Sequence, residues 1–391
     1  MKILLCHNSY RSPGGEDHSF GAQRQLLERH GHEVLLYTRH NEDLDRMGRI
    51  DLAWRTIWNP RTYREIAHLV QRERPQVMHC TNTFPLISSA AYAAARRRGV
   101  AVVQGLHNFR LACVQGGFLR RHAVCEQCAT TLLPWPAVKY ACYRDSRTAS
   151  AVAATALVAN RMARTWTRMV DAFMAPSEVV RRKLAAVGLP ARRIHVVPNF
   201  LASDPGVGSG GGGYAVFAGR LTAEKGIDTL LRAWAELSQP MTLKIAGDGP
   251  LAEAVRRAAA ADARIEWLGW KSPEDVLQLI GGAECLLLPS MFHEAFGRVV
   301  IEAYAKGTPV IGSRRGALPE LIEDGVTGYL FEPGSSADLI TKLRLLTADG
   351  RRLADMRRRS RQRFEERHLG DRCYDGLMQL YGSALSHRRA S

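Results

Sequence analysis

A glycine-rich segment near the middle of the chain constrains its fold more than any other feature. Residues 203–213 read Ser-Asp-Pro-Gly-Val-Gly-Ser-Gly-Gly-Gly-Gly, which is too rich in glycine for a regular helix or strand. On both sides of this segment, short apolar runs alternate with longer stretches of helical periodicity. Such alternation predicts βαβ units, which build a parallel sheet covered by helices on both faces. The sequence therefore predicts two α/β domains joined by a flexible linker.

The length of the chain supports a division into domains, because 391 residues exceed what one hydrophobic core usually supports. We expect a Rossmann-like N-terminal domain over residues 1–200, a linker over 201–213 and a second Rossmann-like domain over 214–370. Residues 371–391 are predicted to form a last helix that packs back on the N-terminal domain. The predicted strands are residues 2–7, 33–37, 76–80, 100–106, 172–175, 195–197, 215–218, 243–246, 265–268, 285–288 and 310–312.

The expected sheets indicate where chemistry should be found. In an open parallel sheet, ligands bind outside the carboxyl ends of the strands. We expect the two sheets to face one another across a cleft that closes by a hinge and excludes water. Functional side chains should therefore follow directly after strands in both halves of the chain.

The net charge of +16 indicates an anionic partner or surface. Nucleic acid, an anionic membrane face and small anionic ligands are the three candidates, with solvated helix faces as the simplest alternative. No nucleic-acid-binding motif is present, so we expect no nucleic-acid partner. No apolar stretch is long enough to span a bilayer or form a signal-peptide core, so we expect a cytoplasmic protein, peripheral on the inner face of the plasma membrane. The excess positive charge is concentrated in clusters at residues 96–98, 120–121, 161–168 and 351–367.

Eight cysteines in a cytoplasmic chain do not imply disulfides. Cys6, Cys80 and Cys285 lie in apolar runs and are expected in the core. Another four lie in a loop-like region and include one Cys-x-x-Cys pair. That spacing could hold a structural zinc, although one pair is a weaker signal than two. These four are Cys113, Cys125, Cys128 and Cys142.

Two motifs follow strands and suit phosphate binding. Gly14 and Gly15, preceded by Pro13, come soon after the first strand, where glycine lets backbone N–H groups approach a phosphate closely. A plain strand-to-helix turn explains this pair equally well, and the Gly-x-Gly-x-x-Gly dinucleotide fingerprint is absent, which argues against a nicotinamide enzyme. The segment 219–226 places Gly219, Arg220 and Lys225 after a strand and before a helix. An arginine fork and a lysine point charge are suitable partners for a diphosphate.

The strongest motif joins two carboxylates at the start of a helix. Glu294 falls in the loop after the strand 285–288, and Glu302 falls inside the following helix. Carboxylates accept hydrogen bonds from neighbouring sugar hydroxyls. The N–H groups of Phe296, Gly297 and Arg298 are expected to be unbonded donors at the helix start, available to an anion.

The surroundings of these carboxylates closely resemble the signature of glycosyltransferase family 4, the retaining group-1 transferases of GT-B fold. The resemblance covers most of residues 194–345 and is looser in the N-terminal half, where it points to transferases of exopolysaccharide and capsule assembly. The segments that carry it are Val197-Pro198-Asn199, Phe217–Arg220, Lys225-Gly226, Ala246–Pro250, Glu294–Glu302, Gly307–Val310, Gly316, Pro319-Glu320, Gly325–Gly328, Pro13–Gly15, His79 with Asn82–Pro85, and His107–Arg110.

The resemblance implies a role for each candidate residue. Glu302 would bind the donor ribose, and Glu294 would contact the donor sugar near its reacting carbon. Arg220 and Lys225 would bind the diphosphate, Gly15 would approach it from the opposite domain, and His107 would line the sugar pocket. The N-terminal domain would bind the acceptor, a glycan or a lipid-linked intermediate of a surface polysaccharide. No cofactor beyond the nucleotide diphosphate sugar is expected, and no metal is needed if these cations neutralise the diphosphate.

Three rival functions remain at this point. A nucleotide-sugar epimerase or hydrolase of GT-B fold would use the same donor without an acceptor. A non-enzymatic nucleotide-binding module would bind without turnover, and a nucleic-acid-binding protein would depend on charge alone. The sequence favours a hexosyltransferase, and it does not name the base, the sugar, the acceptor or the oligomeric state.

Overall fold

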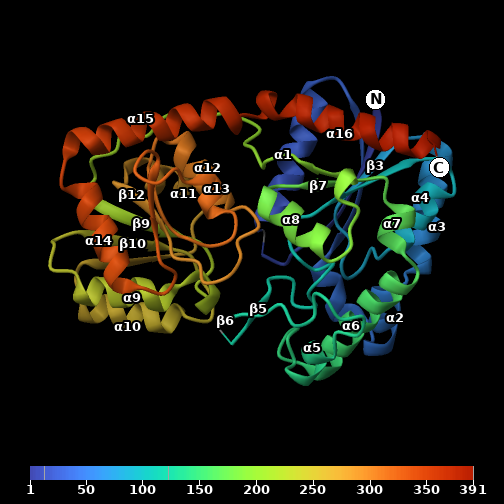
Figure 1. The fold of residues 1–391 in the computed structure, drawn as a ribbon, viewed down its shortest axis with the longest axis horizontal. Helices are drawn as coiled ribbons and strands as arrows, with labels where there is room; N and C mark the ends of the chain where they lie inside the picture. Colours follow the sequence, from blue (N-terminus) through green and yellow to red (C-terminus); the bar gives the residue numbers. More distant parts are fainter. Residues whose placement is uncertain (13, 122, 391) are drawn as a thin grey trace. The chain divides into compact units, whose positions relative to one another are not determined.

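The computed structural model describes residues 1–12, 14–121 and 123–390, so Pro13, His122 and Ser391 lie outside the described residues. The chain divides into two compact units (Figure 1). Unit 1 comprises Met1–Phe118, Cys125–Ala202 and the chain from Gly370 onward. Unit 2 comprises Leu119–Val124 and Ser203–Leu369.

Unit 1 is built on a six-stranded parallel sheet with the order β2-β1-β3-β4-β7-β8. Its central strands are almost continuously buried, as expected for a sheet covered on both faces. Cys6 and Cys80, predicted in the core, are fully buried in it. The strands are β1 (Lys2–Ser9), β2 (Glu33–His40), β3 (Val77–Asn82), β4 (Ala101–Gly105), β7 (Ala172–Ala175) and β8 (Ile194–Val196).

The helices of unit 1 begin where local chemistry favours them. For example, Asn59 accepts hydrogen bonds from the N–H groups of Arg61 and Thr62, and Pro60 occupies the first helical position of α3. One apolar core joins the sheet to the first and last helices of the unit. The helices are α1 (Gly15–Arg29), η1 (Asn41–Arg46), α2 (Arg49–Ile57), α3 (Pro60–Glu73), α4 (Ala90–Arg96), α5 (Trp135–Lys139), α6 (Arg147–Met162), α7 (Thr165–Met169), α8 (Glu178–Ala186), η2 (Ala191–Arg193) and α16 (Gly370–Ala390).

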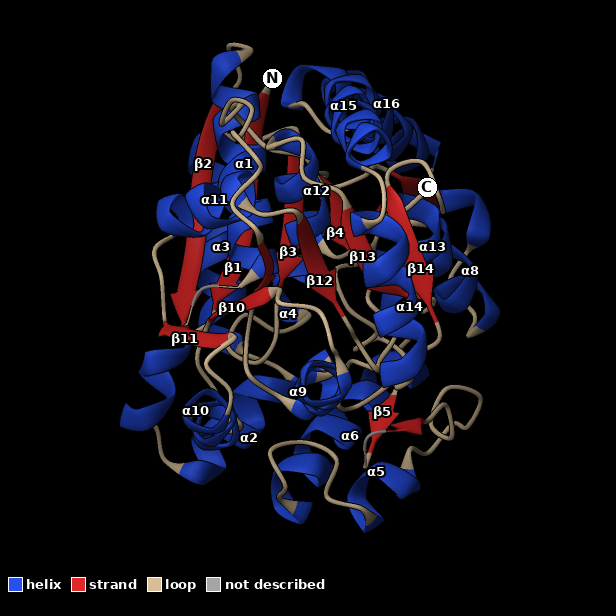
Figure 2. Ribbon diagram, turned by 90° about the vertical axis from the view of Figure 1, so that its left-hand side faces the viewer, coloured by secondary structure: helices blue, strands red, loops and turns tan. Residues whose placement is uncertain are grey.

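Unit 2 repeats this architecture with a second six-stranded parallel sheet, in the order β11-β10-β9-β12-β13-β14. Its strands β10 to β14 are labelled in Figure 2. A two-stranded hairpin, β5 (Leu119–Arg120) and β6 (Ala123–Val124), also belongs to this unit. The sheet comprises β9 (Tyr214–Ala218), β10 (Thr242–Ala246), β11 (Ile265–Gly269), β12 (Cys285–Leu288), β13 (Val310–Ser313) and β14 (Gly328–Phe331). The helices are η3 (Ala223–Lys225), α9 (Ile227–Glu236), α10 (Ala252–Ala261), α11 (Pro273–Gly282), α12 (Arg298–Ala305), α13 (Leu318–Leu321), α14 (Ser336–Thr347) and α15 (Gly350–Arg367).

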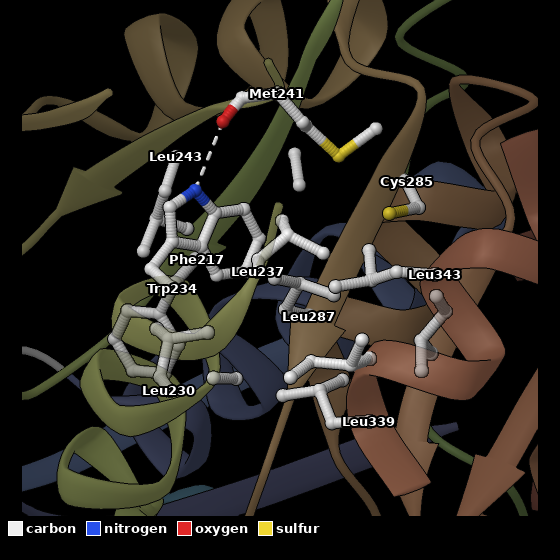
Figure 3. Close-up of a cluster of buried hydrophobic side chains, with 14 of the residues drawn as sticks. Phe217, Leu230, Trp234, Leu237, Met241, Leu243, Cys285, Leu287, Leu339 and Leu343 are labelled. Carbon is white, nitrogen blue, oxygen red and sulfur yellow. Dashed lines mark hydrogen bonds between the residues drawn. The ribbon is translucent and has the colours of Figure 1, made fainter. Parts of the chain in front are cut away.

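The core of unit 2 packs α9 and α14 against one face of the sheet (Figure 3). Trp234 is fully buried there, and its indole Nε1–H donates to the carbonyl oxygen of Met241 at 3.0 Å. A buried indole needs such a partner, because an unpaired N–H group in an apolar core is destabilising. Phe217, Leu230 and Leu287 belong to the same buried cluster, which joins β9, α9 and β12.

The prediction of two parallel α/β domains is confirmed. Ala172–Ala175 and Cys285–Leu288 form strands with the predicted bounds, and the other predicted strands are found with ends shifted by a few residues. The elements that the periodicity did not identify include β14, the hairpin β5–β6, α13 of unit 2 and several helices of unit 1, such as α2, α5 and α6. Within the described residues, no helix combines the length and the apolar character needed to cross a bilayer.

The glycines of the central segment allow close approach between backbones. The N–H groups of Gly210 and Gly212 donate to the carbonyl oxygens of Gly281 and Gly282. A Cβ atom at Gly208 would lie 2.3 Å from the Cα of Gly281, so no larger residue fits there. Glycine is needed at this point of the segment because two chains of backbone pack directly against each other.

Candidate active site

The sheet of unit 2 has a topological switch point next to β9. From β9 the chain forms β10 and β11 on one side and then crosses to β12 on the other side. In such sheets the loops on the two sides diverge at the carboxyl edge and leave a crevice that binds ligands. The loops that leave β9 and β12 at this edge carry the predicted residues Arg220, Lys225 and Glu294. The fold therefore brings candidate residues about 70 positions apart to one edge of the sheet.

Glycines allow the loops at this edge to pack closely. Gly226 has φ of 77°, and a Cβ there would lie 1.9 Å from the carbonyl oxygen of Pro289, in the loop after β12. A Cβ at Gly247, after β10, would lie 1.9 Å from the carbonyl oxygen of Gly219. No side chain larger than hydrogen fits at Gly226 or Gly247 without displacing backbone. These contacts fix the loop that carries Arg220 and Lys225 against its two neighbours.

An ion pair connects the two loops of the switch point. The ammonium Nζ of Lys225 donates to Oε1 of Glu294 at 2.6 Å, and the hydroxyl of Ser290 donates to the same oxygen at 2.6 Å. Glu294 is only 6% exposed, so its carboxylate is held almost entirely by these partners. Lys225 also lies 5.0 Å from the ring centroid of Phe292. One of the two predicted cations is thus already engaged by one of the two predicted carboxylates.

The side chain of Arg220, in contrast, has no such partner in the described part of the chain. Its side chain is exposed and, among the described residues, forms neither a hydrogen bond nor an ion pair. It follows Gly219, whose N–H donates to the carbonyl oxygen of Ala246 and so ties the start of this loop to the end of β10. A fixed backbone that presents an unpaired guanidinium at the carboxyl edge of a sheet is well suited to bind an anion.

The start of α12 supplies donors beside Glu294. Gly297 has φ of 89° as the residue that caps this helix. Among the described residues, the N–H groups of Phe296 and Gly297 donate no hydrogen bond. The side chain of Phe296 is buried with its ring centroid 5.9 Å from that of His368, so Phe296 offers a ligand its backbone and not its ring. Glu302 lies further along α12, where its Oε1 accepts from Arg298 Nε at 3.0 Å.

In unit 1, the predicted glycine pair opens α1, and Pro13 of the motif lies outside the described residues. The N–H of Gly14 donates to Oδ2 of Asp17 at 2.8 Å, so this N–H group is already bonded. The N–H of Gly15 donates to no acceptor in the described part of the chain, and a Cβ at Gly15 would meet nothing within 4 Å. Gly15 therefore has both the unbonded donor and the open space that an anion requires, whereas Gly14 does not.

Three histidines with unpaired ring nitrogens lie near one another in unit 1. Nε2 of His7 lies 2.9 Å from Asp17 Oδ1, and Nδ1 of His79 lies 2.9 Å from the hydroxyl of Tyr381. The remaining nitrogens, Nδ1 of His7 and Nε2 of His79 and of His107, are buried without a partner among the described residues. Burial lowers the pKa of His107. Burial also lowers the pKa of His79, to about 3, and the charge of the nearby His107 makes a smaller contribution in the same direction. The rings of His79 and His107 are therefore neutral near pH 7.

We expect the neutrality of His79 to make the protein sensitive to acid. Its pKa is lower in the folded chain than the 6.5 of a free histidine, so the unfolded state binds more protons between those values. This contribution to stability is complete above pH 6.5 and is lost as the pH falls toward 3. Urea unfolding should show a loss of about 1.4 kcal/mol per pH unit in that window from this group.

A variant pair isolates this contribution to stability. His79→Gln should flatten the pH dependence of the unfolding free energy, whereas His18→Gln, at an exposed position, should leave it unchanged. An equal slope in wild type and His79→Gln would show that His79 is not buried in its neutral form.

A pocket of about 90 Å³ opens at the carboxyl edge of the sheet of unit 1, beside the ends of β3 and β4. On the scale where one water needs roughly 10–15 Å³, this pocket has room for several waters or for part of a polar ligand. Asn82, Thr83, Asn108 and Arg110 supply polar groups, while α6 supplies an apolar wall. Arg110 lies over the ring of Phe84, 4.4 Å from its centroid, and pairs with no carboxylate in the described chain.

The structure does not support zinc at the four clustered cysteines. Cys113 and Cys128 are buried, and Cys125 and Cys142 are partly exposed. Across the described residues, no group of three or more His, Cys, Asp or Glu side chains could hold a metal ion. The neighbourhood of Cys128 and Cys142 is an apolar cluster with α6, so the better interpretation is packing.

Several residues of this arrangement were not identified from the sequence. Ser290 donates to Glu294, and the ring of Phe292 lies beside the ammonium of Lys225. Asp17 accepts a hydrogen bond from the N–H of Gly14. The position of Ser290, directly after a predicted strand and four residues before Glu294, was the only signal for it. Asp17 lies three residues after Gly14, a spacing typical of a capping carboxylate.

Comparison with known families matches nearly the whole chain in two parts. The family described as "Glycosyl transferases group 1" matches residues 208–363, and "Glycosyltransferase Family 4" matches residues 22–204. The first match lies in unit 2 and contains the switch point with Arg220, Lys225 and Glu294.

Curated relatives match over part of their length. The D-inositol 3-phosphate glycosyltransferase of Corynebacterium kroppenstedtii is 35% identical over 153 residues, which is 35% of this chain and 34% of that protein. The lipopolysaccharide 1,2-N-acetylglucosaminetransferase of Salmonella typhimurium is 33% identical over 151 residues, 35% of this chain and 40% of that protein. The matched regions thus span well under two thirds of these relatives.

Solved structures match the complete fold. HepE of Anabaena, solved in complex with UDP, has a TM-score of 0.69 at 18% identity and covers 98% of this chain and 100% of its own. Sucrose-phosphate synthase of Thermosynechococcus elongatus has a TM-score of 0.72 at 17% identity, over 98% and 99% of the two chains. At these identities the likeness establishes the fold, and the GT-B architecture of the chain is confirmed.

Proposed function

The chain belongs to the group-1 glycosyltransferases of family 4, and from this premise we propose that it transfers a hexose-type sugar from a nucleoside diphosphate to an acceptor hydroxyl. The observation that carries the proposal is the arrangement at the switch point of unit 2. There, the Lys225–Glu294 ion pair, the Arg220 side chain and the N–H groups of Phe296 and Gly297 occupy one edge of the sheet. Among the residues that the structure describes, the Arg220 side chain has no polar partner and the two N–H groups donate no hydrogen bond.

This arrangement suits a diphosphate leaving group. Negative charge grows on the departing phosphate oxygens as the bond to the sugar carbon breaks. Fixed donors that are already oriented stabilise such charge without reorganisation. We assign this work to Arg220, Lys225 and the N–H groups of Phe296 and Gly297. Glu294 orients Lys225 and accepts from the donor sugar, and Glu302 binds the ribose.

The stereochemical outcome is proposed on the family resemblance. A double displacement would need a nucleophile next to the reacting carbon, and the best-placed carboxylate, Glu294, already accepts from Lys225 and Ser290. We therefore propose retention by attack on the same face, with the leaving phosphate taking the proton of the acceptor hydroxyl. The roles that the resemblance implies for Gly15 and His107 stay predictions.

We further propose a glycan or lipid-linked acceptor in surface polysaccharide assembly, at the cytoplasmic face of the membrane. The lipopolysaccharide transferase among the relatives supports this acceptor class. The net charge of +16 suits the negative potential of the cytoplasmic leaflet. The HepE complex with UDP-glucose makes UDP-glucose the first donor to test.

Thermal unfolding with a panel of nucleoside diphosphate sugars tests donor binding. A ligand that binds only the folded state at ten times its Kd stabilises the protein by roughly 1.4 kcal/mol and raises Tm. We expect one donor to do this in wild type and to do it less in Arg220→Ala. If no donor raises Tm in wild type, the proposed function is contradicted.

A product assay separates transfer from its rivals. We expect the selected donor to lose its sugar only when an acceptor hydroxyl is present. Steady release of free sugar or an epimerised donor without acceptor would favour a hydrolase or an epimerase. Donor binding without any turnover across acceptors would favour a binding module.

A further inference from the structure

Unit 1 carries a cluster of exposed apolar side chains that the proposed chemistry does not use. Leu132, Leu133 and Trp135 are 62%, 65% and 66% exposed. They lie in the loop before α5 and at its first residue. Soluble proteins seldom expose large apolar side chains together, and such patches mark interaction surfaces.

The opposite side of α5 is firmly anchored. Ala137 is buried with Ala153 and Leu157 of α6 in one apolar cluster, to which Val138 and Tyr143 add partial contacts. The exposed leucines and tryptophan are therefore carried by a packed element. The surface they form is presented to solvent by the fold.

The segment that follows these apolar side chains is rich in positive charge. Residues 132–168 contain six Lys or Arg and only one Asp, so this stretch supplies a large part of the excess charge of the chain. Lys139, Arg144 and Arg147 are exposed and form no ion pair with any described residue. Unpaired cations next to exposed Leu and Trp match the chemistry of an anionic lipid surface.

Helix α2 extends the same end of unit 1. Both α2 and α5 pack against α6, and the three helices lie together in Figures 1 and 2. Ile50, Trp54 and Trp58 of this region are exposed. The preceding η1 contains the carboxylates Glu42, Asp43 and Asp45, which would repel an anionic surface. We therefore assign the electrostatic attraction to an anionic surface to the cations near α5.

We propose that the segment 132–147, called here the α5 surface, docks unit 1 on an anionic lipid bilayer. Leu132, Leu133 and Trp135 enter the boundary between headgroups and acyl chains, and the unpaired cations contact the headgroup phosphates. Ala153 and Leu157 of α6, which pack with α5, also line the pocket that contains Arg110, so docking would bring that pocket close to membrane-bound acceptors.

Vesicle flotation tests the proposal without donor or acceptor, so it can fail while sugar transfer is intact. We expect wild type to float with vesicles of phosphatidylcholine and phosphatidylglycerol, to stay behind with phosphatidylcholine alone, and to be released by high salt. Leu133→Glu combined with Trp135→Glu should weaken binding at least about tenfold. Lys139→Ala, Arg144→Ala and Arg147→Ala should each weaken it about fivefold.

The matched control is Trp270→Glu, which changes an equally exposed tryptophan in unit 2 and should float like wild type. Circular dichroism and Tm establish that every variant is folded. The proposal is overturned if wild type does not float with anionic vesicles, or if folded variants of the α5 surface float as wild type does. It is also overturned if, in the absence of lipid, wild type is a dimer and these variants are monomers, because the surface then binds a second copy of the chain.

Discussion

Arg220→Ala is expected to lower kcat about 10²–10³-fold while leaving stability unchanged. The guanidinium has no partner in the described chain, so its removal breaks no contact within the folded protein. If it binds the departing diphosphate, its loss removes stabilisation that matters most in the transition state, about 2.7–4 kcal/mol for one donor of this kind. Initial rates with the donor found by thermal unfolding measure the effect.

Two further variants sharpen this result. Arg220→Lys keeps a cation but loses the planar fork, so we expect partial recovery of kcat. Arg351→Ala changes an exposed arginine at the start of α15, away from the switch point, and should keep the wild-type rate and urea midpoint. If Arg220→Ala turned over at close to the wild-type rate, the assignment of the diphosphate to this loop would be wrong.

Glu294→Ala is expected to lower both activity and stability. The substitution leaves the ammonium of Lys225 and the hydroxyl of Ser290 without the acceptor they share. The unpaired groups should destabilise the fold by about 1–3 kcal/mol. Lys225 would no longer be held against the loop after β12, and a small misplacement of a catalytic group lowers the rate by about 10²-fold. Urea unfolding and initial rates measure the two effects.

The isosteric variant separates charge from geometry. Glu294→Gln keeps an acceptor oxygen for Ser290 and Lys225, so most of the stability should return while the rate stays low. Glu274→Ala, at an exposed position in the first turn of α11, serves as the control. In a double-mutant cycle with Lys225→Ala, the two substitutions should be non-additive. Additive effects on both rate and stability would contradict a working Lys225–Glu294 pair.

The sequence by itself predicted the architecture because that information is local. The Cys285–Leu288 strand and the Arg298–Ala305 helix were visible as a short apolar run and a 3.6-residue period, each within a dozen residues. Two series of such units imply two parallel sheets, and the rule that ligands bind at carboxyl edges pointed to Arg220, Lys225 and Glu294. Weakly periodic elements such as the five-residue α5 lie below what periodicity can detect.

Only the tertiary structure decided how the candidate residues are engaged. Within the described residues, Lys225 is paired and Arg220 is not, and the N–H of Gly14 is bonded while that of Gly15 is not. In the same part of the chain, Cys128 and Cys142 pack in an apolar cluster, and no group of side chains could hold a metal ion. Each of these outcomes depends on contacts between residues far apart in the chain, or on burial that no short window of sequence records. Local periodicity determines which elements form, whereas long-range packing decides which polar groups remain free to meet a ligand.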